Sequence, residues 1–148
     1  MQVDKYALKA ESSLNVFEFI SEGPKGTIRK LIQFQETNEP GLFNLAFGDK
    51  NYETGEIDDL AISYNSDSEK VLATVVAALY AFFDKYPDAF VYATGITRAR
   101  TRLYRMGITR FYEEMAEDFY LFGQIGDDFY EFEVGKEYKG FLAQRKFD

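Results

Sequence analysis

Apolar and polar positions alternate along the first third of the chain, and this pattern predicts β-strands. Apolar residues concentrate at residues 16–20 and 28–34, and turn-forming residues at 22–26 separate the two runs. Two such runs joined by a short turn are typical of a β-hairpin. Residues 42–47 alternate in the same way, and residues 60–64 predict a short return strand. We therefore expect an antiparallel meander with one face open to solvent.

Apolar residues then recur at spacings of three and four, which predicts the clearest helix in the chain. Residues 66–69 have the pattern of a capping box, in which a hydroxyl residue starts a helix and a Glu follows three positions later. Pro87 ends the pattern. Because so broad an apolar face needs a partner, we expect residues 67–86 to pack on the sheet. The side chains expected in that core are Leu72, Val76, Leu79 and Phe83.

Short strands and short helices are predicted for the next segment. Residues 89–93 form an apolar run with little alternation, which indicates a strand covered on both faces. Residues 98–106 predict a helix, and Gly107 offers a left-handed cap at its end. Thr109 is placed to begin another short helix that reaches residue 117.

The C-terminal part completes a mixed architecture. Residues 119–125 and 129–134 predict a hairpin, and residues 141–146 predict an edge strand. The order strands, helix, strand, helices, strands is typical of the α+β class. We predict an antiparallel β-sheet meander packed on one long helix, with two short helices and a C-terminal hairpin. A length of 148 residues suits one domain, residues 1–148.

Composition excludes several kinds of chemistry. The chain has neither cysteine nor histidine, so disulfides, thiolate metal sites and histidine-based catalytic triads are excluded. Aromatic residues make up 18%, enough to leave some aromatic surface for a partner. Residues 1–10 lack the apolar run of a secretory signal, and no run approaches the roughly 18 apolar residues of a membrane span. We therefore expect a cytoplasmic protein without membrane contact.

Charge is distributed unevenly along the chain. The net charge is −8, which argues against general coating by nucleic acid. No acidic residue lies between Asp88 and Glu113, however, and this interval holds five of the seven arginines. Residues 113–137, by contrast, hold nine acids and one lysine. The sequence thus predicts an acidic molecule with one basic segment.

Helical spacing gathers three of these arginines into a stripe. At about 100° per residue, Arg98, Arg102 and Arg105 share a narrow arc of the helix. A separate arc, which we expect to face the core, holds Ala99, Leu103 and Met106. The far flank holds Arg100 and Tyr104. A helix N-terminus offers free N–H groups to an anion, and Arg has a planar fork suited to phosphate or carboxylate. The candidate anion-binding residues are Thr94, Gly95, Thr97, Arg98, Arg102 and Arg105.

Several interpretations of the stripe stay open at this point. We expect a non-catalytic binding protein that contacts a phosphate-bearing ligand or nucleic acid. A charged helix face is nevertheless most often solvated, and the nine acids of residues 113–137 can pair with the arginines internally. An acidic protein partner and a structural homodimer that buries spare aromatic residues are two further alternatives. A nuclease-type toxin or metal-dependent hydrolase is a further alternative, and a pocket that brings Asp49, Asp58 or Asp128 beside a lysine would favour it.

We expect no metal site and no cofactor. Residues 49–59 begin like a calcium loop, but Gly55 comes one position late and Leu60 stands where the final Glu belongs. Asp128 with Glu137 and Lys139 has the residue types of a metal-dependent nuclease, yet so short a pattern often arises by chance.

Long stretches of the sequence resemble a known family. The matching stretches are residues 43–49, residues 67–76, the Tyr-Pro-Asp of residues 86–88, the Ala-Thr-Gly of residues 93–95, and the Arg-rich residues 97–108. The chain resembles the bacterial domain of unknown function 6934 family, whose uncharacterised small proteins share the unusual Arg-Thr-Arg-Leu-Tyr-Arg run. The resemblance implies one compact domain in a bacterial cytoplasm, and it implies no activity.

Overall fold

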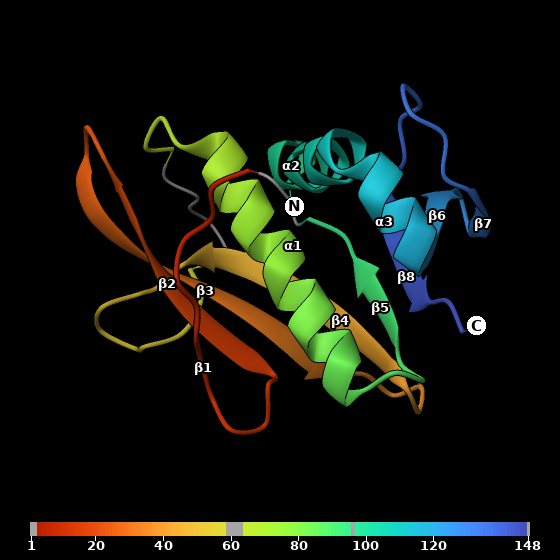
Figure 1. Ribbon diagram of the computed structural model, residues 1–148, viewed down its shortest axis with the longest axis horizontal. Coiled ribbons are helices and arrows are strands. Elements are labelled where there is room, and N and C mark those ends of the chain that lie inside the picture. Colours follow the sequence, from red (N-terminus) through yellow and green to blue (C-terminus); the bar gives the residue numbers. More distant parts are fainter. Residues whose placement is uncertain (1–2, 59–63, 96, 148) are drawn as a thin grey trace.

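The computed structural model describes residues 3–58, 64–95 and 97–147, and within these it shows one eight-stranded sheet with three helices (Figure 1). The strands lie in the order β1-β2-β3-β4-β5-β8-β6-β7. Only β4 and β5 run parallel to each other, and every other neighbouring pair is antiparallel. The predicted α+β class is therefore confirmed.

The first half of the sheet contains the predicted meander, formed by β2 (Val16–Gly23), β3 (Gly26–Glu36) and β4 (Leu42–Asp49). A short edge strand that the sequence did not predict, β1 (Lys9–Ala10), pairs with β2. The hairpin expected over residues 16–34 is present, with Gly23 opposite Gly26 at its tip. The return strand predicted at residues 60–64 lies, apart from Tyr64, outside the described residues.

The helix α1 (Ser68–Lys85) crosses one face of this sheet diagonally (Figure 1). It has 18 residues, and the four predicted core side chains are each at most 7% exposed. The ring of Phe82 stacks on Phe34 of β3, with the ring centroids 4.2 Å apart. The apolar spacing therefore placed the correct face of the helix against the sheet.

The start of α1 differs from the predicted capping box. The residue that precedes the helix is Asp67, and its side chain makes no capping hydrogen bond. Its carboxylate instead accepts hydrogen bonds from the Tyr6 hydroxyl (2.6 Å) and the Ser21 hydroxyl (2.5 Å). The capping-box prediction is wrong because these long-range bonds tie the N-terminal segment and β2 to the helix.

The second half of the sheet contains β5 (Phe90–Ala93), β6 (Phe119–Ile125), β7 (Asp128–Glu131) and β8 (Gly140–Arg145). The C-terminal hairpin, formed by β6 and β7, is confirmed. The edge position predicted for residues 141–146 is wrong, because β8 pairs with β5 on one side and β6 on the other. The hairpin itself occupies the edge of the sheet.

Helices cover the second half of the sheet on one face. Val91 and Ala93 of β5 are buried, whereas Phe90 and Tyr92, which alternate with them, are only partly buried. The expectation that this strand is covered on both faces is therefore wrong. No helix in the described part of the chain is both long and apolar enough to cross a membrane.

The helix α2 (Arg98–Arg110) extends beyond its predicted end and is followed by α3 (Tyr112–Asp118). Gly107 was expected to cap α2 but lies inside it, as does Thr109. A Cβ atom on Gly107 would lie 3.1 Å from Cδ2 of Leu72, which is tighter than ordinary packing. The absence of a side chain at Gly107 therefore lets α2 pack closely against α1, and this glycine does not end the helix.

The face of α2 that packs against the protein is only in part the predicted one, because Leu103 is buried as expected but Ala99 and Met106 are not. The buried residues of α2 are Arg100, Leu103, Tyr104 and Gly107, at the i, i+3, i+4, i+7 spacing of a core-facing stripe. Ala99 is exposed, and Met106 is 44% exposed. The buried face includes a charged residue, Arg100, whose Nη2 donates a hydrogen bond to the carbonyl oxygen of Asp58 (3.4 Å). On the helical wheel, the centre of this buried face lies about 190° from Arg98. The stripe of Arg98, Arg102 and Arg105 therefore points away from the core.

Candidate functional site

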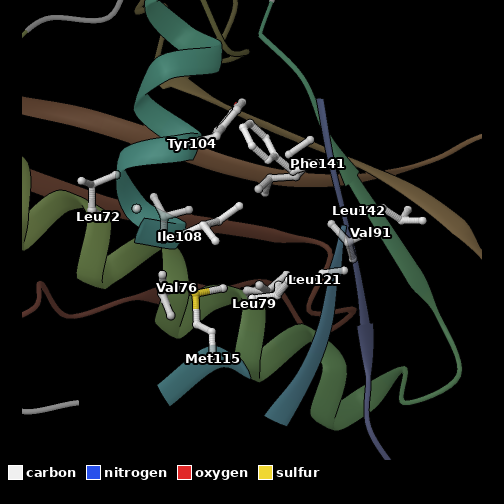
Figure 2. Close-up of a pocket in the computed structure, with 15 residues that line it drawn as sticks. Leu72, Val76, Leu79, Val91, Tyr104, Ile108, Met115, Leu121, Phe141 and Leu142 are labelled. Atoms are coloured by element: carbon white, nitrogen blue, oxygen red, sulfur yellow. The ribbon is translucent and has the colours of Figure 1, made fainter. Parts of the chain in front are cut away.

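Three hollows border α2 in the described part of the chain, and the first is a small apolar cavity between the three helices and the sheet (Figure 2). The third, of about 660 Å³, lies where α2 meets α3 and includes Arg110 and Glu113. The volume of the apolar cavity is about 60 Å³. Side chains from α1, α2, α3 and the sheet converge on it, among them Leu79, Tyr104 and Met115. Burial raises the pKa of Tyr104 to about 12, so its hydroxyl stays protonated at neutral pH. Ligand pockets usually measure roughly 300–1,000 Å³, so this cavity is a packing void and not a candidate site.

The second hollow is an open groove of about 740 Å³ between α2 and the turn that joins β6 to β7. We call it the arginine groove. Arg98, Arg102 and Arg105 line one wall, and Ile125, Tyr138 and Lys139 line the other. The structure thus brings the three arginines of the predicted stripe together with a fourth cation, Lys139, from a segment more than thirty residues away in the sequence.

The arginines of the groove are largely unpaired. Within the described residues, no carboxylate lies in ion-pair distance of Arg98 or Arg102, and both side chains are exposed. Arg105 approaches Glu137, with Nη1 and Oε1 3.8 Å apart, but the Glu137 side chain is 91% exposed. A surface pair of this kind contributes at most about 1 kcal/mol. Of the nine acids in residues 113–137, only Glu137 pairs with a member of the stripe in the described part of the chain.

The turn before α2 holds the other predicted site residues, and their polar groups already have partners. The Thr94 hydroxyl donates to the carbonyl oxygen of Lys139 (2.6 Å), and the Gly95 N–H donates to the Thr101 hydroxyl (3.0 Å). The Thr97 hydroxyl accepts a hydrogen bond from the Arg100 N–H (3.2 Å), as an N-cap does. None of the three is among the residues that line the groove.

Gly95 has a steric role at this turn. A Cβ atom there would lie 2.5 Å from the Arg100 Cβ and from the Thr101 backbone nitrogen. Such contacts do not occur between real side chains, so only glycine lets the turn fold back on the first turn of α2. The turn therefore fixes the start of α2 and, through Thr94, holds residue 139 beside it.

The acids considered for a metal site lie elsewhere. Asp49 accepts a hydrogen bond from the Lys30 ammonium group (2.6 Å), and the Lys30 side chain is almost fully buried. Asp58 contacts Arg100 through its carbonyl oxygen. Asp128 does not line the arginine groove. In the residues that the structure describes, no group of three or more carboxylates is arranged to hold a metal ion.

Sequence reasoning did not include Lys139 and Tyr138 in the candidate site, although both lie on its far wall. The available signal was the position of Lys139 just before a strand, next to Gly140. That signal was too weak to use without knowing that β8 lies beside β5, which brings residue 139 next to the turn that begins α2.

These features define an α+β protein whose sheet is covered by helices on one face and whose cationic groove lies beside α2, at the end of β6 and the start of β8. The chain matches the model of a family described as "Family of unknown function (DUF6934)" over residues 2–146, and it belongs to that family. The resemblance found in the sequence is thereby confirmed. No curated protein and no solved structure matches the chain.

Proposed function

We propose that this protein is a non-catalytic binding protein whose arginine groove holds a phosphate-bearing anion. The observation that carries the proposal is the absence of a carboxylate partner for Arg98 and Arg102 among the described residues. Unpaired guanidinium groups side by side on one helix repel each other by a few tenths of a kcal/mol per pair. A bound anion would relieve that repulsion.

The spacing of the cations favours an extended anion. With a rise of 1.5 Å per residue, Arg98 and Arg102 are about 6 Å apart along the helix axis, and Arg98 and Arg105 about 10 Å apart. Lys139 also lines the groove, and its ammonium group lies 3.8 Å from Oδ1 of the fully exposed Asp127, a surface pair that an anion can replace. Each guanidinium can donate two parallel hydrogen bonds to one phosphate, which suits a ligand with several phosphates in a row.

The turn residues take a supporting role in this proposal. Because the polar groups of Thr94, Gly95 and Thr97 already bond within the protein, they hold the start of α2 and leave ligand contact to the arginines. An acidic protein partner would meet the same cations, and it becomes the favoured alternative if neither phosphate probe below binds while Arg102→Ala leaves stability unchanged. Among the described residues, the groove is lined by three arginines and Lys139 but by one acid, Glu137, which approaches Arg105, so we favour binding without catalysis.

The test is Arg102→Ala, compared with Arg110→Ala. Arg110 carries the same charge on the same helix, but it lies outside the groove and pairs with Glu69 (3.1 Å). Binding of sodium tripolyphosphate and of a fluorescein-labelled 12-nucleotide oligo-dT would be measured by calorimetry and fluorescence anisotropy. Loss of one charged hydrogen-bonding group should weaken binding by about 10- to 100-fold, and Arg110→Ala should have little effect.

Unfolding of the same variants supplies the decisive control. Arg102→Ala should change the free energy of unfolding by less than about 0.5 kcal/mol, as for an ordinary surface residue. A loss of about 3–5 kcal/mol, with neither probe bound by the wild-type protein, would show that Arg102 serves the fold by pairing internally. That result would contradict the proposed function.

A further inference from the structure

The uncovered face of the sheet carries aromatic side chains at the same end as the arginine groove. Tyr92 of β5 and Phe129 of β7 meet there edge to face, with ring centroids 6.1 Å apart. Phe129 is 41% exposed. The Tyr92 hydroxyl donates a hydrogen bond to Oε1 of Gln124 (2.5 Å), and Gln124 also lines the arginine groove. Gln124, near the end of β6, therefore adjoins both the aromatic pair on the uncovered face and the groove beside α2, so a ligand that contacts both passes around this end of the sheet.

Gly140 makes this arrangement of rings feasible. It lies between Tyr92 and Gln124 in the sheet, since β8 pairs with both β5 and β6. A Cβ atom on Gly140 would lie 2.5 Å from the Tyr92 hydroxyl oxygen and 2.8 Å from Oε1 of Gln124. The missing side chain lets Tyr92 lie across β8 and reach the hairpin. We call Tyr92 and Phe129 the aromatic platform.

We propose that the anion of the arginine groove is a single-stranded nucleic acid, with its phosphates on α2 and a base stacked on the aromatic platform. This inference rests on the proposed function and specifies its ligand. Single-strand binding proteins combine a cationic groove that follows the phosphate backbone with aromatic side chains on which bases stack. Both parts are present here, and Gln124 joins them.

Charge and shape favour a single strand over a duplex. The protein has a net charge of −8, so a duplex that spreads its phosphates over a wide surface would meet mostly acidic residues. A duplex also keeps its bases stacked on each other and hidden from protein rings. A single strand can follow the short row of cations and turn one unstacked base onto Phe129.

The test is Phe129→Ala, read against Tyr130→Ala. Tyr130 is the next residue of β7, is 51% exposed, and points to the opposite side of the strand. Binding of a fluorescein-labelled 12-nucleotide oligo-dT would be followed by fluorescence anisotropy, with thermal melts to confirm folding. Phe129→Ala should weaken binding about 5- to 100-fold, Phe129→Trp should retain it, and Tyr130→Ala should stay within about twofold of wild type.

Three probes, namely oligo-dT, a hairpin duplex and sodium tripolyphosphate, separate failure of this inference from failure of the proposed function. If Arg102→Ala weakens oligo-dT binding while Phe129→Ala does not, the groove binds phosphates but the platform stacks no base, and the inference is overturned. It is likewise overturned if a hairpin duplex with the same number of phosphates binds as tightly as oligo-dT, or if only sodium tripolyphosphate binds. If neither oligo-dT nor tripolyphosphate binds wild-type protein, the proposed function fails as well.

Discussion

At the residue scale, Arg100 and Gly107 are two positions of α2 whose surroundings differ from those expected. Arg100 was placed on a flank by its angle on the helical wheel, yet it is 6% exposed and bonds the Asp58 carbonyl oxygen. Charged side chains are buried only when they have such partners. Gly107 was assigned to a helix end because glycine favours caps, whereas here it gives α1 room to approach. In both cases the deciding partner lies far away in the sequence.

Leu79 provides a test of the core at this scale. It is 7% exposed and lines the cavity of about 60 Å³, so Leu79→Ala would enlarge a void that already exists. We expect a loss of about 2–5 kcal/mol in the free energy of unfolding, measured by urea denaturation. Met106→Ala is the matched control, because Met106 is apolar but 44% exposed, and it should cost less than about 0.5 kcal/mol. Equal effects of the two substitutions would show that the core is not where the structure places it.

At the element scale, periodicity identified helices and strands well but not their neighbours. The alternation of β2, β3 and β4 and the three-and-four spacing of α1 follow from backbone geometry, so they are readable from sequence. The position of β8 was predicted wrongly because a strand pairs through backbone groups, which are the same in every residue. Pairing with β5 on one side and β6 on the other makes β8 an interior strand, and its side chains Phe141 and Ala143 are buried.

The N-cap of α2 yields a prediction about this element. Thr97→Ala removes the oxygen that accepts the Arg100 N–H hydrogen bond, and it should lower the free energy of unfolding by about 0.5–2 kcal/mol. Thr97→Ser keeps a hydroxyl at the same position and should restore most of the loss. Thermal or urea unfolding would measure both variants. If Thr97→Ser is as unstable as Thr97→Ala, the methyl group and not the cap holds the start of α2.

At the scale of the whole molecule, two opposing electrostatic effects act on a polyanionic ligand. The net charge of −8 repels it at long range, while four cations around the arginine groove attract it locally. Added salt screens both, but it also competes with the ligand for each cation. The sign of the salt dependence therefore reports which effect is larger at the site.

We expect the local cations to dominate. For a single strand that contacts four cations, the logarithm of the binding constant should fall with the logarithm of salt concentration, with a slope near about −3. Arg102→Ala should make the slope shallower by about 0.7, and Arg110→Ala should leave it unchanged. Anisotropy titrations of labelled oligo-dT at several salt concentrations would measure the slopes. Affinity that rises with salt would mean that the overall negative charge governs binding, and it would exclude the groove as the main contact.

The sequence by itself determined the α+β class, the hairpins, the buried face of α1 and the gathering of Arg98, Arg102 and Arg105 on one helix face. Each of these follows from backbone periodicity, which acts between residues close together in the chain. Only the tertiary structure decided that β8 lies beside β5, that Lys139 faces the arginines, and that Tyr92 reaches Phe129 across Gly140. These contacts depend on the pairing of distant strands, which the pattern of side chains along one segment does not encode.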